Sequence, residues 1–207
     1  MTVEEDDDWG QDGRVLALSD GVFAIAATLL ALDIRVPEGL DTRGLHDALR
    51  GLAPGLTGYA IAFLVIGVLW LGHRELFGDI RRVEPAVAWV NVVLLGFVAL
   101  LPFPSSLLAD YGDEPVAVIG YAASVSMICA LQLVIVALAR RTGTFRAGKQ
   151  ALPAYGPSAV TIVGFVVSMP LALLSPRWAP ACWLLLIPAH AIINRIEKRG
   201  DRGPRAS

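Results

Sequence analysis

Asp20 and His73 are the residues of this sequence whose chemistry needs most explanation, because both are expected in apolar surroundings. Asp20 lies inside a stretch, residues 15–32, whose other polar residues are Ser19 and Thr28. A carboxylate in such a stretch is costly to place in lipid, so it is expected to face protein or water. With His73 it could relay or sense protons, as in a proton-coupled or proton-permeable transporter. Alternatively, both side chains hold neighbouring helices together by hydrogen bonds.

A helical wheel of this stretch separates the charge from a column of apolar side chains. At about 100° per residue, Ile25, Leu29 and Leu32 fall on one stripe with Thr28 beside it. Asp20 lies roughly 140° from Ile25 on the same wheel. The stripe could be ordinary helix packing, with the Thr28 hydroxyl bonded to its own backbone, or it could have a separate function.

Composition places these residues in an integral membrane protein. Apolar residues make up 55% of the 207, only 17% are charged, and the mean hydropathy is +0.60. Six apolar runs are each long enough to cross a bilayer as a helix, and no alternating pattern indicates a barrel. The predicted fold is an all-α bundle of six transmembrane helices, over residues 16–34, 54–77, 86–108, 115–139, 155–175 and 179–195.

The distribution of cations predicts the orientation. Thirteen of the seventeen Lys and Arg fall on one side of a six-span arrangement, which places both termini in the cytoplasm. Residues 1–13 are acidic and are expected to form a disordered tail, residues 14–197 the transmembrane domain, and residues 198–207 a second disordered tail. Between the first two spans, Leu45, Leu49 and Leu52 share a face with charged residues opposite, which predicts a short amphipathic helix at the outer surface.

Several function classes are not expected. Cys129 and Cys182 lie in apolar runs without a partner at ligand spacing, so the sequence predicts neither a metal site nor a disulfide. No separate basic domain offers a surface for nucleic acid. No nucleophile motif or catalytic carboxylate pair appears, so we expect neither an enzyme nor a cofactor.

Three motifs follow one another in the first half of the chain. The first begins at Arg14 and reads R-x-x-x-L-S-D-G-V-F-A-I-A-A-T-L-L-A-L-D-I; the second is W-L-G-H from Trp70; the third is L-P-F-P-S from Leu101, preceded in the same span by Asn91. Together they resemble the signature of the transmembrane protein 175 family, which comprises potassium channels of bacterial membranes and of animal endosomes and lysosomes. That family usually has Phe where this chain has Leu18.

The resemblance implies a potassium-permeable channel without a carbonyl-lined TVGYG filter. In the family the first helix of each subunit lines the pore, apolar side chains form its constriction, and a threonine layer contributes to potassium preference. Carried over to this chain, the constriction falls on Ile25, Leu29 and Leu32, with Thr28 as the hydroxyl layer. Asp33 then lies near the outer mouth, where carboxylates would concentrate cations, although it could equally cap the helix or pair with Arg35.

The resemblance also implies an assembly and a supporting network. One copy of the signature per chain indicates a homotetramer in a bacterial plasma membrane, with other copies and membrane lipid as its partners and potassium as its permeant ion. The family's polar network carries over to five residues of this chain, with Arg14 or a protonated His73 expected to pair with a buried Asp20. These residues are Arg14, Ser19, Asp20, Trp70 and His73. An apolar constriction coordinates ions weakly, so the expected selectivity for potassium over sodium is modest.

Overall fold

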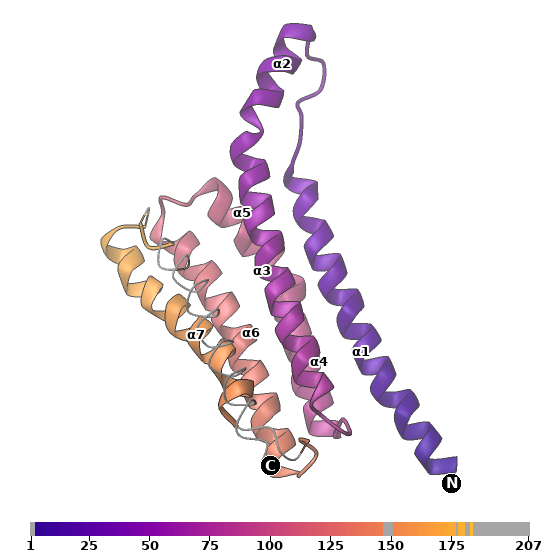
Figure 1. The fold of residues 1–207 in the computed structure, drawn as a ribbon. Coiled ribbons are helices and arrows are strands. Elements are labelled where there is room, and N and C mark those ends of the chain that lie inside the picture. Colours follow the sequence, from indigo (N-terminus) through magenta and orange to yellow (C-terminus); the bar gives the residue numbers. More distant parts are fainter. Residues whose placement is uncertain (1–2, 147–150, 177, 181–182, 184–207) are drawn as a thin grey trace, which may run out of the picture.

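A computed structural model describes residues 3–146, 151–176, 178–180 and 183, and their regular structure is helical (Figure 1). Its elements are α1 (Val3–Leu29), the 3₁₀ helix η1 (Leu30–Asp33), α2 (Thr42–Gly51), α3 (Ala53–Gly78), α4 (Pro85–Leu100), α5 (Pro102–Asp110), α6 (Pro115–Arg141) and α7 (Ala151–Leu174). The prediction of an all-α fold is confirmed for this part of the chain.

Four stretches are long and apolar enough to cross a membrane, and they coincide with the first four predicted spans. They are Asp12–Leu32, Gly55–Gly78, Pro85–Asp110 and Pro115–Arg141. The chain is therefore a multi-pass membrane protein. Helix α7 overlaps the predicted fifth span, and its segment Val160–Leu174 is apolar but shorter. The predicted sixth span, 179–195, lies almost wholly outside the described residues, so the six-span count and the cytoplasmic termini stay predictions.

Proline sets the start of three helices. Pro85, Pro102 and Pro115 stand at the first helical position of α4, α5 and α6, where the missing N–H would have no partner within the helix anyway. Because Pro102 cannot continue the ladder of α4, that helix ends at Leu100 and the third span is completed by α5.

The acidic segment at the start of the chain differs from the prediction. Helix α1 begins at Val3, so the expected disordered tail over residues 1–13 is helical from Val3 onward. The predicted C-terminal tail, 198–207, lies outside the described residues.

Helix α6 lies at the centre of the packing and contacts both α4 and α7, while α1 packs against α3 and α4 (Figure 1). The side chains of Leu94, Val98, Val125 and Ile128 are fully buried between them. At the end of the bundle near the α3–α4 connector, the backbone of Ile80 pairs with that of Phe145 in an isolated antiparallel bridge. This bridge ties the α3–α4 connector to the segment that follows α6.

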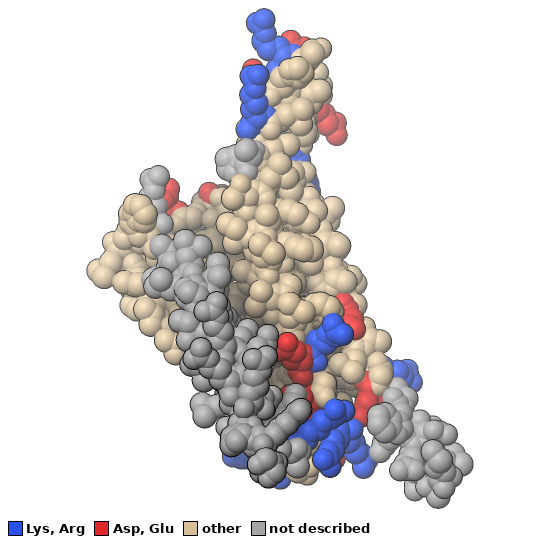
Figure 2. All heavy atoms as spheres, in the orientation of Figure 1, with Lys and Arg blue, Asp and Glu red and all other residues tan. Residues whose placement is uncertain are grey.

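The segment between η1 and α3 projects beyond the rest of the bundle (Figure 1). We call residues 34–52 the arm. Its helix α2 confirms the predicted amphipathic helix and starts at an N-cap, Asp41, whose carboxylate accepts a hydrogen bond from the Gly44 amide at 2.7 Å. Figure 2 shows that, on the face drawn, charged side chains gather at the arm and at the opposite end, with largely uncharged surface between them.

Candidate functional site

One side of α1 packs into the bundle. Ser19, Phe23, Ala26 and Leu30 recur at intervals of four, three and four residues, which aligns them on one helical stripe. All four are buried. Because this stripe fixes the rotation of α1 about its axis, it also decides which side chains of α1 remain open.

The opposite side of α1 carries the predicted apolar stripe. Ile25 is 60% exposed, Leu29 41% and Leu32 61%, and Thr28 is exposed as well. Leu18, at 54% exposure, extends the stripe toward the N-terminal end of the span. The structure therefore brings the predicted constriction residues and the predicted hydroxyl onto a single open side of the helix.

The Thr28 hydroxyl has a defined direction. Its Oγ1 donates a hydrogen bond to the carbonyl oxygen of Ile25, three residues earlier, at 2.9 Å. Since the backbone takes the hydroxyl proton, the oxygen lone pairs remain available to a donor or cation on the open side.

The C-terminal end of the stripe is wound more tightly than the rest. Leu32 belongs to the 3₁₀ turn η1, and its carbonyl accepts a hydrogen bond from Arg35 Nε at 3.1 Å. In 3₁₀ geometry the side chains at i and i+3 nearly eclipse, which keeps Leu32 in line with Leu29. The side chain of Asp33 lies outside what the structure describes, so its role at the outer mouth stays a prediction.

A buried hydrogen-bond chain joins α1 to α3 and α4. Asn91 on α4 donates from Nδ2 to Ser19 Oγ at 3.0 Å, and its Oδ1 lies 2.8 Å from His73 Nε2 on α3. Ser19 Oγ in turn donates to the Val15 carbonyl at 2.9 Å. We call Ser19, His73 and Asn91 the buried triad, since each is no more than 1% exposed.

The directions of these bonds assign the histidine tautomer. Because the Asn91 amide nitrogen faces Ser19, its carbonyl oxygen faces the histidine, and Nε2 of His73 must carry a hydrogen. Phe77 stacks on the imidazole at a centroid distance of 4.6 Å, and Phe23 lies against it at 5.4 Å. The ring is thus held by both polar and aromatic contacts, as expected for a residue that positions helices.

A second polar cluster lies at the edge of the groove between α1 and α3. Asp20 Oδ1 accepts a hydrogen bond from the indole Nε1 of Trp70 at 2.8 Å, and the guanidinium carbon of Arg74 lies 5.7 Å from the centroid of the same indole. We call Asp20, Trp70 and Arg74 the edge cluster. The indole donates its N–H to the carboxylate and offers its ring to the cation, so it links two opposite charges.

Two expectations about the polar network are not met within the single chain. Asp20 is exposed rather than buried in the single chain, because it lies beside the buried stripe and not on it. Arg14 is exposed too, and among the described residues no ion pair joins it to Asp20. No hydrogen bond connects Asp20 with His73 in the described chain either; each has a different partner.

Two residues outside the predicted network belong to these clusters. Asn91, which the sequence analysis named only as a residue preceding the third motif, is the centre of the buried triad. Arg74 was not foreseen as a partner, although its position four residues after Trp70 on one helix was a usable signal. The described chain contains no group of three or more His, Cys, Asp or Glu that could hold a metal ion.

A groove lies along each of the two flanks of α1. Between α1 and α3 runs a groove of about 400 Å³ with the Asp20 carboxylate as its charged group. It is lined by Asp20, Phe23, Ala24, Ala27, Phe63, Ile66, Gly67 and Trp70. Apart from the edge cluster it offers mainly apolar surface.

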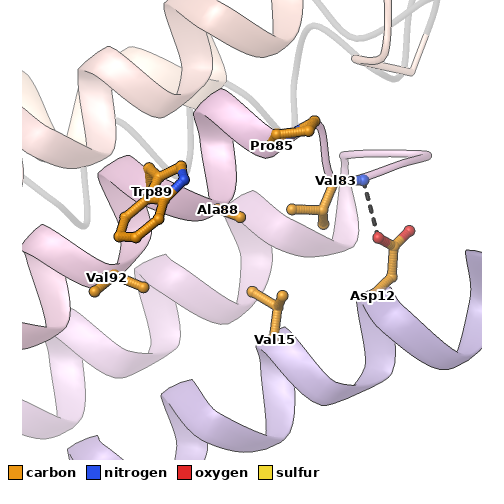
Figure 3. A pocket seen from close by; sticks show the side chains of 7 residues that line it. All are labelled: Asp12, Val15, Val83, Pro85, Ala88, Trp89 and Val92. Carbon is orange, nitrogen blue, oxygen red and sulfur yellow. Dashed lines mark hydrogen bonds between the residues drawn. The ribbon is translucent and has the colours of Figure 1, made fainter.

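The other flank, between α1 and α4, is closed at one end by a hydrogen bond (Figure 3). Asp12 Oδ1 accepts from the backbone N–H of Val83 at 3.0 Å and so fastens α1 to the α3–α4 connector. The groove beside this bond measures about 300 Å³ and is lined by Asp12, Val15, Val83, Pro85, Ala88, Trp89 and Val92. Its largest lining side chain, Trp89, is 71% exposed.

Comparison with known proteins connects this geometry to one family. The family described as endosomal/lysosomal potassium channel TMEM175 matches residues 14–102. A potassium channel of Streptomyces collinus is 45% identical over 104 residues, which is 50% of each chain. The human endosomal/lysosomal proton channel TMEM175 is 36% identical over 110 residues, 49% of this chain and 22% of the human one. The chain thus spans half or less of the length of these two relatives.

A solved structure extends the likeness to most of the chain. The crystal structure of a lysosomal potassium-selective channel TMEM175 homolog from Chamaesiphon minutus aligns with a TM-score of 0.73 and 30% identity. The alignment covers 89% of this chain and 99% of that one, and so includes the helices beyond the three motifs. The shared motifs, the fold and this coverage show that the chain belongs to the TMEM175 family.

Proposed function

We propose that this protein is a potassium-permeable channel of a bacterial plasma membrane, in which α1 of each of four copies lines a central pore. The observation that carries the proposal is the open apolar stripe of Ile25, Leu29 and Leu32 on the most motif-rich helix of the chain. The relatives named potassium channels support potassium as the ion that permeates.

Two exposed features of α1 support the assembly: the apolar stripe and the Asp20 carboxylate. A single helix cannot enclose a pore, so several copies must supply one, and a closed ring of identical subunits is the usual solution. In addition, the exposed Asp20 carboxylate lies within a membrane span, where it must face protein or water rather than acyl chains. A neighbouring copy beside the groove between α1 and α3 would meet this requirement.

The proposed pore discriminates between ions through dehydration. An apolar ring removes water from a passing ion without replacing it, so conduction is slow and the pore can close by dewetting. Potassium holds its water less tightly than sodium, so the ring obstructs sodium more. Thr28 adds a weak ligand, because its hydroxyl proton is donated to the Ile25 carbonyl and its oxygen is left free.

Ion flux through purified protein in liposomes tests the proposal. We expect potassium flux to exceed sodium flux modestly, and we expect Ile25→Ala to increase potassium flux because it widens the narrowest ring. Ile61→Ala is the matched control, since Ile61 on α3 is similarly exposed, at 55%, but is not on α1. Equal flux in the two variants would place the constriction elsewhere, and no flux in any protein would exclude a channel.

Thr28 is tested by relative permeability. Thr28→Ala is expected to lower the ratio of potassium to sodium permeability toward one, because the hydroxyl oxygen is lost while the apolar rings remain. Thr28→Ser keeps an oxygen and is expected to retain most of the ratio. Reversal potentials with potassium on one side and sodium on the other measure both variants. A ratio unchanged in Thr28→Ala would remove Thr28 from the selectivity layer.

Proton permeation is a second candidate, favoured by the name of the human relative. Asp20 is the titratable group of the edge cluster, although the described structure shows no hydrogen bond from it to His73. A pH-sensitive dye inside the same liposomes measures proton flux directly. Proton flux that disappears in Asp20→Asn, while potassium flux persists, would favour this function.

A further inference from the structure

The arm is the part of the chain with the least support from the rest of it. No residue of α2 is buried, and its main contact with another helix is with α3. Figure 1 shows the arm standing in line with α3 beyond the ends of the other helices. An ordered segment in this position needs a source of stability that the single chain does not provide.

The short length of α2 shows why it needs such a source of stability. Helices shorter than about 12–15 residues are marginal in water on their own, and α2 has 10. The Asp41 cap contributes on the order of 1 kcal/mol, and the Arg50–Asp47 pair at 3.4 Å is largely exposed and adds little. Packing of an apolar face against another surface is what stabilises most protein helices.

Such a face is present and open. Leu45 is 40% and Leu49 51% exposed, and their spacing of four residues places them on one side of α2. Arg43 and Asp47 project from the other side at the same spacing. Leu56, in the first turns of α3, adds a third large apolar side chain at 49% exposure.

Contact with lipid does not explain how the apolar face of α2 is covered. An amphipathic helix bound to a bilayer lies in the plane of the membrane, across the direction of the spans. Helix α2 instead continues the direction of α3, beyond the spans that end at Leu32 and begin at Gly55 (Figure 1). Acyl chains that surround those spans do not reach an upright helix beyond them.

A second copy of the chain does explain how the apolar face of α2 is covered. The arm follows directly from the outer end of α1, which in the proposed channel is the helix nearest the symmetry axis, so neighbouring arms approach one another there. Because α2 carries Asp47 as well as Arg43 and Arg50, neighbouring arms can approach without the repulsion between helices of a single charge sign. A helix of one charge sign would instead repel its copies.

We propose that the Leu45 and Leu49 face of α2 binds the arm of the adjacent copy, so that four arms form a collar around the outer mouth of the pore. This inference rests on the proposed tetrameric channel. The collar connects the subunits outside the membrane, independently of contacts between their spans.

Crosslinking of the full chain in liposomes tests the collar. Cys129 and Cys182 are first replaced by Ala, and Leu49→Cys is then treated with a short bismaleimide and analysed on denaturing gels. Arg43→Cys is the matched control, because it lies on the same helix but on the charged side. We expect the Leu49→Cys variant to shift from the monomer band to crosslinked bands and Arg43→Cys to stay mainly monomeric.

Three results would overturn the collar. Equal crosslinking of the two variants would mean that α2 has no preferred face. An absence of crosslinks, together with quenching of a fluorophore on Leu49→Cys by brominated lipid, would place the face in the membrane. An absence of both would leave the face in water. The mass of the native assembly and its potassium flux separate these failures from failure of the channel: a conducting tetramer without crosslinks refutes only the collar, whereas a silent monomer refutes both.

Discussion

Ser19 and Asp20 are adjacent in sequence, yet they belong to two polar clusters of opposite character. The buried triad is enclosed by α1, α3 and α4, and its bonds of 2.8 and 3.0 Å are made entirely within one chain. The edge cluster is reached from outside, and its carboxylate is exposed in the single chain. A rotation of about 100° about the helix axis separates the two environments.

This difference indicates a division of labour between folding and assembly. A hydrogen-bonded group inside the chain stabilises that chain alone, and its loss leaves buried partners unsatisfied. A charged group at an open edge within the membrane is costly until another surface covers it. The triad should therefore determine whether a subunit folds, and the edge cluster whether subunits associate.

Replacing the centre of the triad should have the largest effect. Asn91→Leu keeps the number and branching of the side-chain heavy atoms but leaves His73 Nε2 buried without its partner and Ser19 Oγ with only its bond to the Val15 carbonyl, at a cost of about 2 kcal/mol in the free energy of unfolding. Thermal unfolding in detergent measures the loss, and Val92→Leu, at an exposed site on the same helix, is the control. An unchanged melting temperature would show that the triad does not hold the fold.

Removing the charge of the edge cluster should affect assembly more than folding. Asp20→Asn retains an oxygen that can accept from Trp70 Nε1, so the subunit should lose less than about 1 kcal/mol. The tetrameric fraction, measured as native mass, is expected to fall. If the variant assembles fully and instead changes the pH response of its flux, Asp20 is a sensor and the division proposed above is wrong.

The smallest effect is expected from Arg74. Arg74→Gln removes the cation beside the Trp70 indole, and such contacts are worth about 0.5–1 kcal/mol at exposed sites. Arg81→Gln, in the connector that follows α3, controls for the loss of one positive charge at that end of the bundle. The same shift in melting temperature in both variants would mean that the contact with Trp70 contributes nothing specific.

Sequence reasoning recovered what a single helix determines by itself. Hydropathy located the first four spans, and the wheel of α1 placed Ile25, Thr28 and Leu32 together on a side that the structure leaves open. It also separated them from Asp20. These features depend on helical periodicity, which the order of residues fixes directly.

Sequence reasoning was less successful for features that depend on how neighbouring helices pack. A wheel shows that Asp20 lies apart from Ile25 but not where α3 and α4 lie, so the exposure of Asp20 was not foreseen. The same limit hid Asn91 as the centre of the triad, because its partners are 18 and 72 residues away.

The hydrogen bond from Val83 to Asp12 has a mechanical consequence for α1. The side-chain hydrogen bonds described above that fasten this helix to the rest of the chain, at Asp12, Ser19 and Asp20, lie in the N-terminal half of its span, while apolar packing holds its C-terminal half within the described chain. The N-terminal half of the span is therefore the fixed end of the helix, and the part from Asp20 to Leu32 is a lever roughly 18 Å long. A tilt too small to break any of the three bonds is magnified along that length and is greatest at Leu32, where the open stripe ends.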